Sequence, residues 1–214
     1  MTAGDFTIRP YRAGDLDALY TICLLTADSG WDGSLLYANA PQSVGDLYAA
    51  PYAELEPELC LVLETVAGVQ GYILGTADTE RFEEWLGAEW FPRMRRKYSW
   101  PQAAPTAAER LIRRFHAPVV RESADLLHDF PAHLHIDLLP AAQGRGQGRA
   151  LMTAWLELLQ LRGIPGVHLG LGIRNERARR FYERVGFRLL EQRGGPPATS
   201  QLMGLKLSER PGGQ

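Results

Sequence analysis

The residues with the clearest chemical character form a glycine-rich loop: Gln143, Gly144, Arg145, Gly146, Gln147 and Gly148. An apolar stretch that ends at Leu139 precedes this loop, and an amphipathic stretch starts near Arg149. Glycine permits backbone angles that other residues resist and lets a bulky anion approach the main chain. Backbone N–H groups at the start of a helix attract phosphate. The loop therefore predicts a phosphate-binding site between a strand and a helix.

Two common phosphate-binding motifs do not fit this loop. A P-loop ends in Gly-Lys-Ser or Gly-Lys-Thr, whereas Arg149 and Ala150 follow Gly148. A dinucleotide-binding loop has glycine at its first, third and sixth positions. The sixth position is Arg149 when counted from Gly144 and Leu151 when counted from Gly146. Both motifs are therefore excluded.

A second polar cluster precedes the loop and consists of His133, His135 and Asp137. Side chains alternate between the two faces of a strand, so these three share one face, where His135 could orient Asp137 or relay a proton. Alternating ligands of this kind can also hold zinc, and the pattern resembles the ligand run of metallo-β-lactamase-like hydrolases. That family has a further histidine where this chain has Leu138. A metal-dependent hydrolase is thus an alternative function, and we expect no metal.

The first half of the chain is expected to place these residues as follows. A short strand ends at Ile8 and Arg9, Asp15 caps a helix that contains Leu16 to Cys23, and residues 26–57 form a loop with short helical pieces. Residues 59–66 and 69–76 form a hairpin. Residues 77–131 form a helical insertion with a break at Pro92 and a capping box made by Thr106 and Glu109.

The second half alternates strands and helices. We expect a strand at 132–139, the loop at 140–148, a helix at 149–161, a strand at 167–171, a helix at 176–185 and extended runs at 187–191 and 201–207. The chain is thus predicted to be one α/β domain over residues 1–214 that contains the insertion 77–131.

Composition excludes several classes of protein. The chain has 214 residues, of which 45% are hydrophobic and 22% charged, as in soluble globular domains. No membrane span or export signal is visible, so we expect a cytoplasmic protein. A net charge of −2 and the lack of a known nucleic-acid-binding motif argue against nucleic acid as a partner. Cys23 and Cys60 are expected to be buried free thiols. Arginine outnumbers lysine twenty-one to two, which is typical of GC-rich bacterial genomes.

The loop and a second motif together resemble the GNAT family of acetyl-CoA-dependent N-acetyltransferases. Its phosphate loop reads Gln or Arg, two residues, Gly, one residue, Gly or Ala, which Gln143, Gly146 and Gly148 match. About thirty residues later the family has Asn, two residues, Ala, two residues, Phe-Tyr, three residues, Gly-Phe. The matching residues here are Asn175, Ala178, Phe181, Tyr182, Gly186 and Phe187. The resemblance implies a mixed, mostly antiparallel sheet flanked by helices, in which the 77–131 insertion lies between the third and fourth strands.

The resemblance also implies roles for individual residues. Backbone groups of Leu138 and Leu139, at the end of a strand that splays from its neighbour, would bind the pantetheine of acetyl-CoA and polarise the thioester carbonyl. The main chain from Gln143 to Arg149 would bind the pyrophosphate, and Asn175, Ala178 and Tyr182 would also contact the cosubstrate. A departing thiolate gains from a proton donor, so Tyr182 would be the general acid. Asp137 is the candidate proton acceptor or acceptor-binding residue, while Phe181 and Phe187 are expected in the core.

The acceptor of the acetyl group is left open by the sequence. We expect a primary amine, on a small molecule or a protein lysine, and the candidate contacts are Trp31, Asp32, His135 and Asp137. The insertion is expected to cover or narrow the acceptor site. A non-catalytic acetyl-CoA-binding module is a further alternative. Because GNAT proteins are often dimers, a homodimer is a candidate state.

Within the GNAT family, the run from His133 to Pro140 and the tryptophan-rich insertion are similar to one particular branch. This branch contains the acetyltransferase-like domain at the carboxyl end of O-GlcNAc hydrolases and free-standing bacterial relatives of that domain. Nothing in the chain resembles a glycoside hydrolase.

Overall fold

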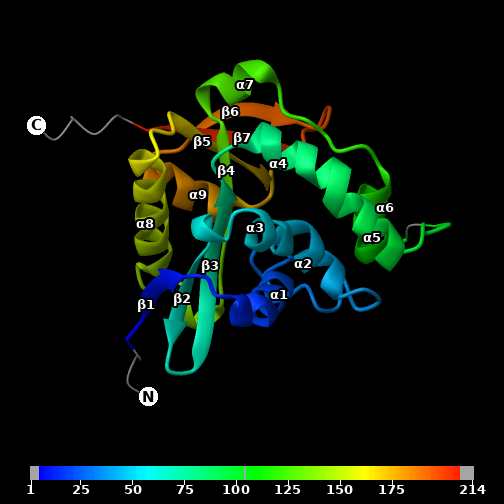
Figure 1. The fold of residues 1–214 in the computed structure, drawn as a ribbon, viewed down its shortest axis with the longest axis horizontal. Helices are drawn as coiled ribbons and strands as arrows, with labels where there is room; N and C mark the ends of the chain where they lie inside the picture. The colour runs from blue at the N-terminus through cyan, green and yellow to red at the C-terminus, as the bar shows by residue number, and fades with distance from the viewer. Residues whose placement is uncertain (1–4, 104, 208–214) are drawn as a thin grey trace, which may run out of the picture.

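The computed structural model describes residues 5–103 and 105–207, whose central feature is a twisted sheet (Figure 1). Within these residues the strand order is β1-β2-β3-β4-β5-β7-β6. The strands are β1 (Thr7–Pro10), β2 (Leu61–Thr65), β3 (Gly68–Thr76), β4 (Ala132–Leu138), β5 (Gly166–Gly172), β6 (Arg188–Arg193) and β7 (Ser200–Lys206). Only β4 and β5 pair in parallel; the other neighbours are antiparallel. The expected mixed, mostly antiparallel sheet is confirmed.

Helices cover both faces of this sheet (Figure 1). One group follows β1 and comprises α1 (Leu16–Leu25), α2 (Gln42–Tyr48) and α3 (Ala50–Leu55). The insertion between β3 and β4 adds α4 (Thr79–Trp85), α5 (Phe91–Lys97), α6 (Ala107–His116) and α7 (Ala124–Asp129). The opposite face carries α8 (Gln147–Leu161) and α9 (Glu176–Val185). The predicted helical insertion between the third and fourth strands is thus confirmed.

Two apolar clusters, one on each face of the sheet, hold these layers together. Successive side chains of a strand point to opposite faces, so neighbouring residues join different clusters. Tyr72 and Leu74 of β3 join α1, α2 and α3 in the first cluster, whereas Ile73 between them joins α8 and α9 in the second. Trp155 of α8 is fully buried in the second cluster. Gly75 of β3 permits its close approach, because a Cβ atom there would lie 2.3 Å from the Trp155 ring.

The insertion contributes to the core as well as to the surface. It supplies buried residues of the first cluster, namely Phe82, Leu86, Trp90, Phe91, Met94, Leu111 and Phe115. A buried carboxylate fixes it to the rest of the molecule: Asp46 of α2 accepts hydrogen bonds from Tyr98 at 2.5 Å, Lys97 at 2.7 Å and Tyr20 at 2.6 Å. The insertion is therefore an integral part of one layer, in addition to any role as a cover.

Two local predictions differ from the structure. Asp15 precedes α1, but its side chain accepts hydrogen bonds from the Arg9 guanidinium and the Arg12 N–H, so it does not cap the helix. The charge-assisted hydrogen bonds from Arg9 are stronger than a cap to the backbone, so the Asp15 carboxylate binds Arg9 instead of capping α1. The chain also does not break at Pro92, which lies in the first turn of α5 after a π-helical turn at Leu86–Trp90. Proline lacks an N–H but fits a first helical turn.

Other local predictions are confirmed. The hairpin is formed by β2 and β3, and Thr106 and Glu109 make the capping box of α6. Cys23 and Cys60 are buried free thiols. None of the helices in the described part of the chain combines the length and apolar character that a membrane span requires.

Candidate functional site

The site begins where two parallel strands separate. β4 pairs with β5 only at Ala132 and His133, although β4 continues to Leu138 and β5 to Gly172. From Leu134 onward β4 is paired with β3 alone. The edge of β4 that faces β5 is therefore left without a strand partner, as expected for the strand that precedes the glycine loop.

Backbone direction decides which residues of β4 serve this open edge. The Leu139 N–H donates to the Gln70 carbonyl at 2.8 Å, so it points toward β3 and is not free for a ligand. Successive residues of a strand direct their backbone groups to opposite edges, so those of Ile136 and Leu138 point toward β5. The role expected of Leu138 stays a prediction that this direction favours, whereas the Leu139 N–H is already paired within the sheet. Ile136 joins Leu138 at the open edge, which strand pairing alone reveals.

The glycine loop lies directly beyond the open end of β4 and leads into α8. Gly144 and Gly146 have positive φ angles of 70° and 77°, and Gly146 is the residue before the first turn of α8. No side chain caps this helix start, so its first N–H groups are available to an anion. The helix includes Gln147 and Gly148, two residues earlier than the sequence predicted. The backbone N–H groups predicted for phosphate binding thus belong to both a loop and a helix terminus.

Gln143 fastens this loop to two other elements. Its Nε2 donates to the Leu138 carbonyl at 2.7 Å, and its Oε1 accepts from Arg177 of α9 at 2.6 Å. The side chain therefore holds the loop in shape through these two hydrogen bonds. Arg145 and Arg149 are exposed, and within residues 5–103 and 105–207 neither forms an ion pair. Their charges favour an anion at the loop.

Helix α9 brings the second motif to the other side of the split. Asn175 caps this helix, since its Oδ1 accepts from the Ala178 N–H at 3.1 Å. Tyr182 is 8% exposed and contacts Phe181 and Phe187 with ring centroids 5.3 and 5.5 Å away. Burial raises the pKa of the Tyr182 phenol, and the charge of Asp137 raises it further. The phenol therefore keeps its proton at neutral pH, as a general acid must.

Asp137 lies on β4, and its hydrogen-bond partner differs from the expected one. Its Oδ2 accepts a hydrogen bond from the Tyr72 hydroxyl at 2.7 Å. Burial raises the pKa of the Asp137 carboxyl, while the hydroxyls of Tyr72 and Thr26 oppose that shift. His135 does not orient Asp137: among the described contacts its ring lies against Tyr48 and Tyr52, at centroid distances of 5.5 and 5.3 Å.

His133 and His135 lie on the same face of β4 as Asp137, as predicted. Their rings, however, are not arranged to bind a metal ion together with Asp137. The two ring nitrogens of His133 are hydrogen-bonded to Tyr52 at 2.8 Å and Thr79 at 2.7 Å. Burial lowers the pKa of His133 well below its usual range and that of His135 to about 4. Over the described ranges, no group of three or more His, Cys, Asp or Glu side chains could hold a metal ion.

Trp31 and Asp32, the remaining acceptor candidates, lie on the exposed loop between α1 and α2. Trp31 is 68% exposed, and Asp32 accepts a hydrogen bond from the Ser34 N–H at 2.8 Å. Neither contacts Asp137 or Tyr182 among the interactions of the described residues. The structure therefore brings Asp137, Tyr182 and Leu138 to one place and leaves Trp31 and Asp32 at the surface.

Comparisons with known proteins agree with this geometry. The family model of the GNAT acetyltransferase domain matches residues 119–189. The crystal structure of SsHAT is 40% identical, with a TM-score of 0.83, and the alignment covers 94% of this chain and 98% of that one.

Two curated proteins are also similar. The protein O-GlcNAcase of Rattus norvegicus is 28% identical over 198 residues, which are 91% of this chain but 21% of that protein. The mycothiol acetyltransferase of Beutenbergia cavernae is 50% identical over 48 residues, which are 22% of this chain and 16% of that protein. The matched regions therefore span about a fifth or less of the length of these two relatives.

Proposed function

This chain belongs to the GNAT family of acetyltransferases and is thus an acyltransferase, and we propose that it transfers the acetyl group of acetyl-CoA directly to a primary amine. The observation that carries this proposal is the split between β4 and β5, which ends at an uncapped helix start. The extended pantetheine arm of acetyl-CoA fits the open edge of β4. Its phosphates then lie at the N–H groups of the loop and of the start of α8.

The residues around the split suit the steps of this reaction. The Leu138 N–H donates to the thioester oxygen and stabilises the negative charge that forms as the amine attacks. Asp137 takes the proton of the incoming ammonium. The neutral amine then forms the carbon–nitrogen bond, and Tyr182 gives its proton to the sulfur as the carbon–sulfur bond breaks. The second proton that the nitrogen sheds returns to the Tyr182 oxygen, so the products are the amide and a free thiol, and the proton on Asp137 passes to solvent. The loop from Gln143 to Arg149, with Asn175 and Ala178 at the start of α9, holds the cosubstrate in place.

The first test is calorimetric titration of the protein with acetyl-CoA, with and without a chelator, followed by a thiol-release assay. The amine panel contains small amines, amino sugars and lysine peptides. We expect binding that the chelator does not change, and thiol release with at least one class of amine. The protein without an amine is the control for hydrolysis of the thioester.

Two other results would contradict the proposal in different ways. Binding without thiol release on any amine would support a non-catalytic acetyl-CoA-binding module. Absence of binding, together with a fold that the chelator destabilises, would support the metal-dependent hydrolase.

A further inference from the structure

Tyr72 and Asp137 form a cross-strand pair beside the split. They lie directly opposite each other in the β3–β4 ladder, so their side chains are neighbours on the same face of the sheet. The Tyr72 hydroxyl donates to Asp137 Oδ2 at 2.7 Å. Tyr72 is fully buried and Asp137 half-buried, so of the two residues only Asp137 keeps some exposed surface.

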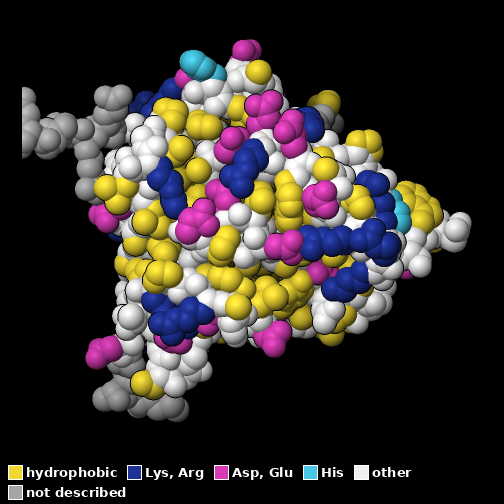
Figure 2. Space-filling view, in the orientation of Figure 1, with side chains coloured by type: hydrophobic (Ala, Val, Ile, Leu, Met, Phe, Trp, Pro, Cys, Tyr) yellow, Lys and Arg dark blue, Asp and Glu magenta, His cyan; other side chains and the backbone are white. Residues whose placement is uncertain are grey.

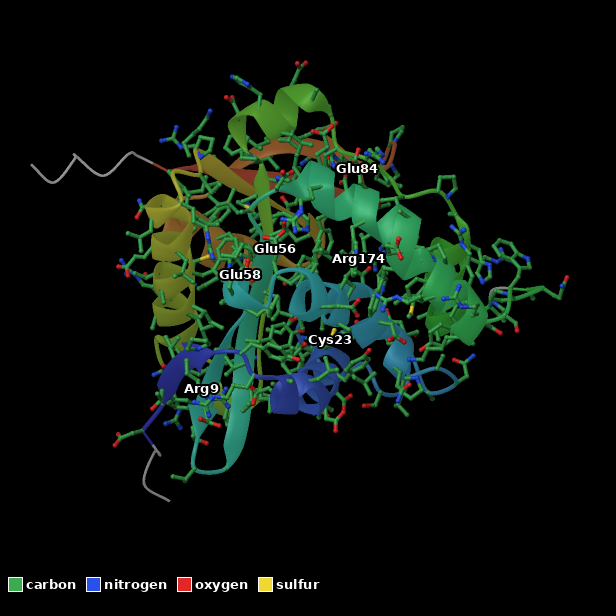
Figure 3. All side chains as sticks on the ribbon, viewed as in Figure 1. Arg9, Cys23, Glu56, Glu58, Glu84 and Arg174 are labelled. Atoms are coloured by element: carbon green, nitrogen blue, oxygen red, sulfur yellow. The ribbon has the colours of Figure 1, made fainter. Side chains whose placement is uncertain are left out.

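The Tyr72 hydroxyl has Asp137 and Cys23 as its polar neighbours. Cys23, labelled on α1 in Figure 3, is 4% exposed, and its thiol lies beside this hydroxyl. A phenol has one proton to donate, and the short contact with Asp137 takes it. Cys23 fills the remaining side. The titratable groups that face Asp137 are Tyr72 on β3, Cys23 on α1 and Tyr182 on α9, with His135 next on its face of β4.

Asp137 can accept a proton only while its carboxyl is ionised, although its surroundings are partly apolar. Burial raises the pKa of the Asp137 carboxyl, which favours the protonated and inactive form. A hydroxyl that donates to the carboxylate acts in the opposite direction and stabilises the active form. Because that hydroxyl occupies Oδ2, the second oxygen of Asp137 is left to accept a proton.

We propose that Tyr72 is a positioning residue for Asp137, which it holds ionised and oriented so that Oδ1 takes the proton of the acceptor amine. This role rests on the proposed acetyl transfer. Tyr72 lies 65 residues from Asp137 in the sequence and outside the two GNAT-like motifs, that of the glycine loop and that of α9. It contacts no substrate itself and acts only through Asp137.

The test is the pH profile of kcat/KM for the amine at saturating acetyl-CoA, in the wild type and in Tyr72→Phe. Loss of the donor raises the pKa of Asp137, so the acid limb of the profile moves to higher pH. We expect a shift of about one pH unit, which lowers the rate about tenfold below the limb. At alkaline pH the variant should recover to within about twofold of the wild type, and the KM for acetyl-CoA should not change.

Tyr98→Phe is the matched control. It removes the same kind of bond, between a tyrosine and the carboxylate of Asp46, far along the chain from the split. This variant should lose thermal stability without any shift of the acid limb. The comparison separates an effect on Asp137 from a general loss of packing.

Either of two results would overturn the role of Tyr72: a Tyr72→Phe profile that superimposes on that of the wild type, or a rate loss of equal size at every pH. If Tyr72→Phe does not fold, Tyr72→Met also removes the hydroxyl while it keeps a long apolar side chain, and should move the limb in the same direction. The carboxyl titration of Asp137 by carbon NMR gives the same comparison without turnover. A wild type that transfers no acetyl group would count against the proposed function, whereas an unmoved NMR titration would count against Tyr72.

Discussion

Tyr182 owes its proposed function to burial. Its ring lies between Phe181 and Phe187, and burial raises the pKa of its hydroxyl, so a proton is available to a leaving thiolate across the neutral range. The motif around Tyr182 indicated this role, but the closeness of Asp137, which raises that pKa further, is visible only in the folded chain.

Replacement of Tyr182 by phenylalanine should separate catalysis from binding. The ring contacts remain, while the proton donor is lost, so we expect kcat to fall about 10²- to 10⁴-fold. The Kd for acetyl-CoA, measured by calorimetry, should stay within about twofold. Tyr20→Phe, which alters a hydroxyl at Asp46, is the control and should retain its turnover. Full turnover in Tyr182→Phe would overturn the assignment.

At the scale of elements, the start of α8 and the loop before it act together. Gly146 has a φ of 77°, and a Cβ atom there would meet no heavy atom within 4 Å. The requirement for glycine is therefore one of backbone angle and not of space. This distinction makes Gly146 a clean probe of the loop.

Two substitutions of Gly146 should differ in effect. Alanine disfavours a positive φ by about 1–2 kcal/mol, whereas asparagine adopts it more readily. If the loop shifts to relieve the strain, Gly146→Ala should weaken acetyl-CoA binding by roughly 5- to 30-fold, and Gly146→Asn by less. Calorimetric titration measures both values. Wild-type affinity in both variants would indicate that the loop does not bind the phosphates.

At the scale of the whole molecule, the insertion and the first helices form one layer. Figure 2 shows Lys and Arg side chains gathered where α5 and α6 lie, and α5 and α6 carry them in their last turns. One of these cations, Lys97, reaches the buried Asp46. Asp46 thus joins α2 to the insertion through Lys97 and the Tyr98 phenol, and to α1 through the Tyr20 phenol.

Asp46→Ala should lower the stability of the whole molecule. The change leaves two tyrosines and a lysine without their acceptor, so the free energy of unfolding should fall by about 2–4 kcal/mol. For a chain of this size that corresponds to a fall in Tm of roughly 5–15 °C, measured by circular dichroism. The exposed Asp17→Ala is the control and should change Tm little. An unchanged Tm in Asp46→Ala would show that the Asp46 carboxylate does not stabilise the attachment of the insertion.

Much of the fold was predictable because its signals are local. The hairpin, the capping box at Thr106 and the helix over 176–185 depend on residues a few positions apart, and each was confirmed. The predictions that failed, the cap at Asp15 and the break at Pro92, concern sites where two local signals compete. The ion pair with Arg9 and the π-helical turn decide them in the structure.

By itself, the sequence determined the order of the elements and the residues of the glycine loop, because spacing along one strand or helix settles both. Only the tertiary structure decided which edge of β4 stays open, that the backbone N–H of Leu138 rather than that of Leu139 faces this edge, and that Tyr72 rather than His135 contacts Asp137. These features depend on the register between strands that are distant in the chain. A one-residue change of register would turn every side chain to the other face of the sheet, and no local pattern encodes that choice.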